Sequence, residues 1–82
     1  MIRTIRLLGV TRELAAAETL RLELSTAATV ADLRIELAAA APDLASTLPA
    51  CAVALEHRYC TDDVRIADFE GEIMLVPPVS GG

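Results

Sequence analysis

The chain of 82 residues contains no lysine and no tryptophan, and it has one tyrosine and one phenylalanine. All seven cationic side chains are arginine. Without lysine, no side-chain amine is available to react with an activated carbonyl group of the same chain; only the α-amino group remains. The formal net charge is -5. Because nucleic acids and anionic membranes require clustered cations, both are disfavoured as partners.

The sequence also lacks a long apolar run and a cysteine motif. Its longest uncharged stretch before the C-terminal end, Leu44 to Leu55, is too short for a transmembrane helix. Charged residues interrupt the start, where a signal peptide would lie. We therefore expect a cytoplasmic protein in which Cys51 and Cys60 are free thiols with structural roles. The cysteines form no Cys-x-x-Cys pair, and His57 alone does not complete a zinc site, so we expect no bound metal.

Apolar residues make up 54% of the chain, which favours a single domain with a core but without a deep catalytic pocket. Period-two alternation and short apolar runs predict strands over residues 2–8, 20–24, 51–55 and 72–76, with a short return strand starting at Tyr59. Thr11 is predicted to cap a short turn of helix after the first strand. The last strand is apolar at four successive positions, so both of its faces require cover.

One amphipathic helix is predicted in the middle of the chain. Thr29 and Asp32 have the spacing of a capping box, and Pro42 ends the helix. Its apolar side chains have helical spacing: Val30, Leu33, Leu37 and Ala40. The elements predict an α+β fold, a mixed sheet of four to five strands with one main helix on one face. We expect a partner protein to cover part of the other face.

The C-terminal segment Pro77-Pro78-Val79-Ser80-Gly81-Gly82 is the most informative part of the sequence. Its prolines stop the strand ladder and favour a stiff, extended exit from the sheet. Its glycines allow the backbone to enter a narrow site. A Gly-Gly end arises by chance in about 0.5% of chains. We predict a domain over residues 1–76 and a tail over residues 77–82 whose reactive group is the Gly82 carboxylate.

The order of the elements and this ending resemble the ubiquitin-like β-grasp fold and, within it, the small subunits of molybdopterin synthase, which are sulfur carriers. Residues 12–14 and 29–33 carry the weaker part of the resemblance. The ending Pro77-Pro78-Val79-Ser80-Gly81-Gly82 matches that family residue for residue. Sulfur carriers of the thiamine pathway share the Gly-Gly end but usually lack the Pro-Pro-Val-Ser.

The resemblance implies that an E1-like enzyme uses ATP to adenylate Gly82, and that a persulfide donor then converts it to a thiocarboxylate. The thiocarboxylate would donate sulfur to cyclic pyranopterin monophosphate in the large subunit of a heterotetramer. Residues Pro77, Pro78, Val79, Ser80 and Gly81 would insert into that partner. The chain itself would bind no cofactor and would be a sulfurtransferase subunit without a complete active site.

The resemblance also suggests an apolar patch beside the tail, made of Leu7, Cys60 and Val76, although all three residues are equally consistent with a core position. We expect His57 in an exposed turn. We expect Glu70 and Glu72 to be surface charges, with salt bridges to a partner as the alternative.

Three other functions remain open at this point. The chain is also consistent with a sulfur carrier for thiamine thiazole, cysteine or transfer RNA. It is further consistent with a ubiquitin-like modifier of lysines on target proteins, or with an interaction module whose tail is inert.

Overall fold

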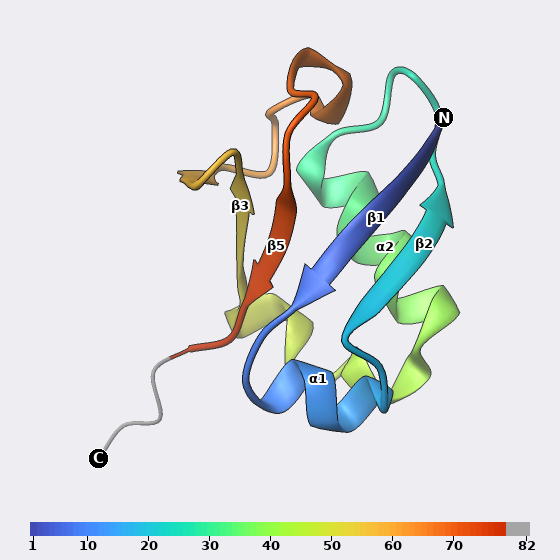
Figure 1. Ribbon diagram of the computed structural model, residues 1–82, viewed down its shortest axis with the longest axis vertical. Helices are drawn as coiled ribbons and strands as arrows, with labels where there is room; N and C mark the ends of the chain where they lie inside the picture. The colour runs from blue at the N-terminus through green and yellow to red at the C-terminus, as the bar shows by residue number, and fades with distance from the viewer. Residues whose placement is uncertain (79–82) are drawn as a thin grey trace.

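The computed structural model describes residues 1–78 and shows a five-stranded mixed sheet with one long helix across one face (Figure 1). The strand order is β2-β1-β5-β3-β4. The strands are β1 (Ile2–Leu7), β2 (Thr19–Glu23), β3 (Ala52–Leu55), β4 (Arg58–Cys60) and β5 (Ile73–Val76). The helices are α1 (Val10–Ala15) and α2 (Val30–Ala40), with short 3-10 turns at Pro42–Leu44, Leu48–Ala50 and Ile66–Asp68. The predicted α+β architecture is confirmed.

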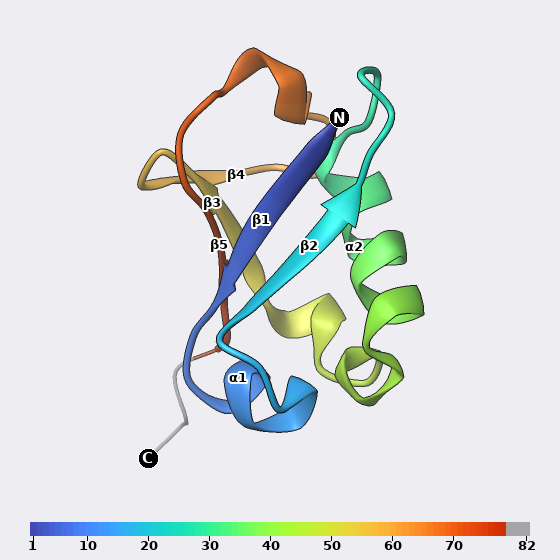
Figure 2. The same ribbon diagram turned by 45° about the vertical axis from the view of Figure 1, so that its right-hand side comes forward.

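The first and last strands lie side by side in the middle of the sheet (Figure 2). β1 pairs with β5 in parallel, and its other neighbour, β2, is antiparallel. Ile5 is therefore aligned with Leu20 on one side and with Ile73 on the other. β3 is antiparallel to both β5 and β4. The predicted hairpin of the first two strands is confirmed, with α1 in its connection.

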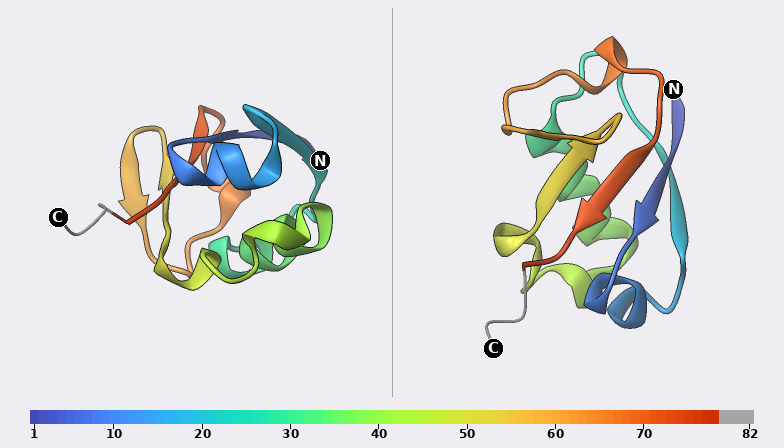
Figure 3. Two further views of the ribbon diagram at one scale, coloured as in Figure 1. Left: turned by 90° about the horizontal axis from the view of Figure 1, so that it is seen from below. Right: turned by 60° about the vertical axis from the view of Figure 1, so that its left-hand side comes forward.

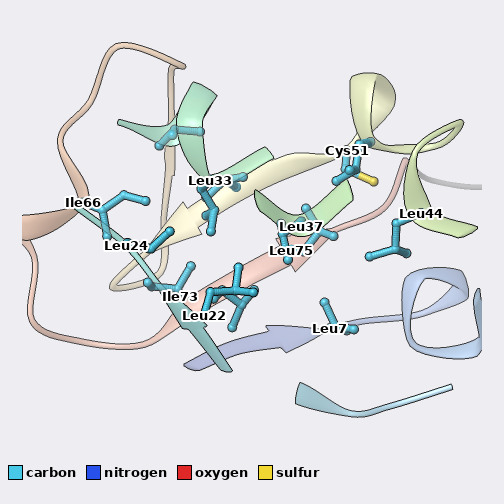
Figure 4. Close-up of a cluster of buried hydrophobic side chains, with 14 of the residues drawn as sticks. Leu7, Leu22, Leu24, Leu33, Leu37, Leu44, Cys51, Ile66, Ile73 and Leu75 are labelled. Carbon is cyan, nitrogen blue, oxygen red and sulfur yellow. The ribbon is translucent and has the colours of Figure 1, made fainter. Parts of the chain in front are cut away.

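The core lies between the sheet and α2 (Figure 4). Strand residues alternate between the two faces of a sheet. On the face toward α2 the fully or almost fully buried side chains are Ile5, Leu7, Leu22, Val53, Leu55, Ile73 and Leu75. They meet Val30, Leu33 and Leu37 of α2. Ala40 was assigned to the apolar face of this helix by its spacing, but it is exposed. The chain leaves the helix after Ala40, and it is Ala41, four residues beyond Leu37, that is buried.

The two helices begin in different ways. At α2 the predicted capping box is present, since Thr29 N–H donates to Asp32 Oδ2 (2.9 Å) and Asp32 N–H donates to Thr29 Oγ1 (3.4 Å). At α1 the prediction that Thr11 caps the helix is wrong. Gly9 occupies the N-cap position, while Thr11 is fully buried in the first turn and its hydroxyl donates to the Leu8 carbonyl (2.6 Å).

The loop before β5 is held from both sides. Arg3, on β1, donates to the carbonyls of Phe69 (2.8 Å) and Gly71 (2.9 Å). The carboxylate of Glu56, in the turn after β3, accepts from the N–H groups of Glu70 (3.0 Å) and Gly71 (3.1 Å). Both groups fix the start of the last strand.

Within residues 1–78, no helix has the length and apolar character needed to cross a bilayer.

Leu37 and Ile35 provide a matched test of this packing, because they lie on opposite sides of α2. Leu37 is fully buried and Ile35 is 66% exposed. We expect Leu37→Ala to lower the free energy of unfolding by about 2–5 kcal/mol through lost burial and a residual cavity. Ile35→Ala should change it by less than about 0.5 kcal/mol. Urea unfolding monitored by circular dichroism measures both, and equal losses would contradict this orientation of the helix.

Candidate functional site at the tail exit

The tail leaves from the centre of the sheet, at the end of β5 (Figure 3). Val76 is aligned with Ala52 of β3, and the Leu8 N–H donates to the Leu75 carbonyl (3.3 Å) just beyond β1. The base of the tail is thus bordered on both sides. Among the predicted tail residues, Pro77 is half-buried and Pro78 is exposed. The predicted reactive residue and its neighbours, Val79, Ser80, Gly81 and Gly82, lie outside the described residues.

Pro77 lies against the turn between β1 and α1. Gly9 adopts a φ of +56°, a conformation that costs residues with a side chain more than it costs glycine. A Cβ at position 9 would lie 3.0 Å from Pro77 Cγ, so glycine also provides the space for the proline ring. The Thr11 hydroxyl donates a hydrogen bond to the Leu8 carbonyl of the same turn. We call residues 8–11 the Pro77 seat, because they fix the place from which the tail starts.

An apolar patch borders the tail on the open face, the sheet face opposite α2. Residues aligned across paired strands point to the same face of a sheet. Since Ile73 and Leu75 point to the core, alternation along β5 directs Met74 and Val76 to the open face. The residues aligned with them on β3, and the residue of β4 aligned with Ala54, point to the same face. The patch consists of Met74, Val76, Ala52 and Tyr59, whereas Ala54, which points to the same face, is buried. Tyr59 is 74% exposed.

The patch differs from the one expected from the sequence. Leu7 is 1% exposed and belongs to the core, which corrects its assignment to a surface patch. Cys60 is aligned with Val53 and packs against the core from the helix side, so it does not lie on the open face either. Of the three residues, Val76 lies on the open face, and its contact with a partner stays a prediction. Met74 and Tyr59 were missed, although the alternation around Ile73 and Leu75 is a signal that identifies Met74.

The polar residues singled out in the sequence lie outside the patch. His57 is exposed in the turn between β3 and β4, as predicted. That turn follows Leu55, which is aligned with Ile73, so it lies at the end of β5 away from the tail. Glu70 and Glu72 are exposed, as expected for surface charges. Glu72 forms a long ion pair with Arg6 (3.7 Å), an exposed residue of β1.

Both thiols are free, as predicted. Burial raises the pKa of the Cys51 thiol, although the side chain of Thr47 and the positive charge of Arg34 oppose this shift. The Cys51 S–H donates to the Thr47 carbonyl (3.3 Å). Cys60 is half-buried. Residues 1–78 bring together no three His, Cys, Asp or Glu side chains in a way that would hold a metal ion.

A small domain of this architecture, with its last strand leading into an uncharged Gly-Gly tail, is typical of ubiquitin-like carriers. The model of the ThiS family matches residues 5–82. The chain therefore belongs to the ThiS family of ubiquitin-like sulfur carriers, which work with E1-like activating enzymes.

Solved structures confirm the β-grasp fold. The crystal structure of small archaeal modifier protein 1 from Haloferax volcanii has a TM-score of 0.87 at 27% identity and covers 100% of both chains. A second Haloferax volcanii protein, solved in solution, has a TM-score of 0.78 at 26% identity, covering 100% of this chain and 87% of the other. A candidate molybdopterin converting factor subunit 1 from Pyrococcus furiosus has a TM-score of 0.79 at 19% identity, covering 95% and 98%. A search of curated proteins finds no match.

The Pro77 seat is testable by a double-mutant cycle. We expect Gly9→Ala to lower the free energy of unfolding by about 1–3 kcal/mol, because alanine is strained at this φ and its Cβ crowds Pro77. The loss should be smaller in the Pro77→Ala background, where the ring carbons are gone but the strain remains. Urea unfolding of the four proteins gives the coupling energy. Losses that agree within about 0.5 kcal/mol in the two backgrounds would show that the two residues are independent.

The two thiols should differ in reactivity. Because the thiolate is the reactive form, burial and a raised pKa protect Cys51, and its reaction with iodoacetamide should require a higher pH or unfolding. Cys60, which is half-buried, should react first. The intact mass of the folded Cys51→Ser variant reports the labelling of Cys60, and that of the folded Cys60→Ser variant reports the labelling of Cys51. Faster labelling of the variant that retains Cys51 would contradict the structure.

Proposed function

We propose that the sulfur of this carrier goes to cyclic pyranopterin monophosphate, the precursor of molybdopterin, from a thiocarboxylate at Gly82. The observation that carries the proposal is the ending Pro77-Pro78-Val79-Ser80-Gly81-Gly82 at the end of the central strand β5. Membership of the ThiS family supports sulfur transfer, and the residues before Gly-Gly favour this acceptor.

The chemistry requires activation, because a carboxylate is a poor electrophile. The Gly82 carboxylate attacks the α-phosphorus of ATP on an E1-like enzyme, and pyrophosphate leaves. A persulfide sulfur then attacks the acyl carbon and AMP leaves. A thiol reductant cleaves the resulting S–S bond and becomes a disulfide with the donor thiol. The thiocarboxylate sulfur attacks a carbon of the precursor, and the carbon–oxygen bond at that carbon breaks so that its oxygen substituent leaves. Hydrolysis of the resulting thioester returns the carboxylate while the sulfur stays on the pterin.

The described residues are suited to present such a tail. The Pro77 seat and the two prolines limit the conformations of the tail before binding, which lowers the entropy lost when it is immobilised. No side chain after Glu72 is charged, so entry into a narrow channel buries no unpaired side-chain charge. The apolar patch offers a docking surface beside the tail. The partner would be a large synthase subunit in a heterotetramer, which would contribute the pterin-binding and proton-transferring groups.

Intact-mass spectrometry tests the carrier chemistry at Gly82. Incubation with an E1-like enzyme, ATP and a persulfide donor should increase the mass by the difference between one sulfur and one oxygen. Deleting Gly82 should abolish this product and leave the unfolding midpoint unchanged, because the tail lies beyond the core strands. A product in the deletion variant, or its absence in the native chain, would rule out Gly82 as the sulfur-bearing residue.

The acceptor is determined by a second assay with the purified thiocarboxylated protein. Cyclic pyranopterin monophosphate and a candidate large subunit should together yield a dithiolene, whereas thiazole precursor, cysteine and transfer RNA should not be modified. Selective modification of one of those three would replace the proposed acceptor and leave the carrier chemistry intact.

Protein modification is the second candidate function, because the chain is 27% identical to small archaeal modifier protein 1 over its full length. A modifier would form isopeptide bonds with lysines on other proteins. Since this chain has no lysine, it offers no side chain for linking one copy to the next, and only its α-amino group could join copies. Conjugates that survive denaturation would support this function.

A further inference from the structure

Strand β2 forms one edge of the sheet, and its outer backbone groups have no hydrogen-bond partner within residues 1–78. Leu24 N–H donates to the Met1 carbonyl (2.7 Å), and Leu7 N–H donates to the Glu18 carbonyl (2.9 Å). In an antiparallel pair, residues bonded to the partner strand alternate with residues whose N–H and C=O groups point away from it. The register therefore directs the backbone groups of three exposed residues outward: Thr19, Arg21 and Glu23.

A groove of about 310 Å³ lies beside this edge, between the end of β2, the loop that follows and α2. Figure 2 shows β2 and α2, the strand and the helix that contribute lining residues. Leu24 and Ala28 contribute apolar lining, and Ile35 of α2, 66% exposed, forms part of the wall. Ile35 is the most exposed of the large aliphatic side chains in the described part of the chain.

The rim of the groove is acidic. Its lining residues include Glu23, Asp32 and Glu36 and no arginine. Glu23 pairs with the Met1 amino group (2.7 Å), and Asp32 is used in the capping box. Glu36 makes no ion pair within residues 1–78. An apolar floor, an acidic rim and an open strand edge thus occur together.

We infer that the β2 edge and this groove bind an extended segment of a partner protein that joins the sheet as a sixth strand. An added strand satisfies the outward backbone groups, and its alternate side chains reach the groove. The charge of the rim selects a segment in which an apolar residue is flanked, two positions away on each side, by lysine or arginine. A second copy of the chain fits poorly, because its net charge is -5.

The groove lies at the opposite end of the sheet from the tail, and β1 separates the β2 edge from β5. Glu23 is aligned with Ile2, at the start of β1, whereas the tail starts beside Leu8 and Gly9, beyond the end of that strand (Figure 1). A protein bound at β2 would therefore leave the tail free to enter an enzyme. The surface is suited to hold a partner during the reaction, and it does not depend on which acceptor receives the sulfur.

Nuclear magnetic resonance titration with a model peptide tests this inference. The probe is acetyl-Thr-Lys-Thr-Val-Thr-Lys-Thr-amide, which places lysines and valine on one side of an extended strand. At low ionic strength it should shift the amide signals of Thr19, Arg21 and Glu23 and the methyl signals of Ile35. The same peptide with glutamate in place of lysine should bind at least about tenfold more weakly.

Substitutions at two positions separate this site from non-specific attraction. Arg21→Pro removes an outward N–H without breaking the β1–β2 ladder, since proline is tolerated on edge strands, and should weaken binding at least about tenfold. Arg21→Gln, which keeps the N–H, is its matched control and should bind within about twofold of the native chain. Glu36→Arg, on the exposed face of α2, should reverse the preference between the two peptides.

Several results would overturn the inference: no binding of the basic peptide, equal binding of both peptides, equal affinity for Arg21→Pro and Arg21→Gln, or shifts centred on Met74 and Tyr59. If Arg21→Pro does not fold, Glu36→Arg decides the outcome. The chain lacking Gly82 should bind the basic peptide as the native chain does, so the titration does not depend on sulfur transfer.

Discussion

The parallel pairing of β1 with β5 is the interaction on which the rest of the structure depends. It joins the first and last strands, which are the most distant in sequence, and it closes the core beneath α2. It also holds the base of the tail beside the turn that follows β1, where Gly9 leaves room for Pro77. Arg3 extends the same contact at the other end by binding the loop before β5. If the register between β1 and β5 shifted, Pro77 would no longer lie beside Gly9, and the tail would start from a different place.

The two faces of the sheet have different roles because the domain has only one long helix. The inner face carries the large aliphatic side chains and provides stability through burial against α2. The outer face carries smaller or more exposed apolar groups around Met74 and Val76, and nothing within residues 1–78 covers them fully. The buried core and the exposed apolar patch therefore occupy opposite sides of the same strands.

Local patterns in the sequence predicted the elements well, because capping and periodicity depend on near neighbours. The Thr29–Asp32 box and the alternating leucines of β2 are examples. The Gly-Gly tail likewise identified the kind of protein.

The apolar patch was predicted poorly, since it requires the register of strands that are distant in sequence. Leu7 illustrates this, because its place in the core follows from alternation with Ile5, whereas the family resemblance suggested the surface. Thr11 was misjudged because Gly9, with its positive φ, starts the helix two residues earlier.

The start of β1 and the start of the tail lie at opposite ends of the sheet, and this separation has a practical consequence for labelling and purification (Figure 1). An affinity tag or fluorescent protein fused ahead of Met1 would leave the C-terminal carboxylate unobstructed. The same fusion would stand next to Leu24 and Glu23, at the mouth of the acidic groove. A bait immobilised in this way would retain proteins that engage the tail and would exclude those that join the β2 edge. A bait attached through the exposed turn at His57, which lies at the end of β5 away from the tail and on the other side of the sheet from β2, would leave both regions accessible.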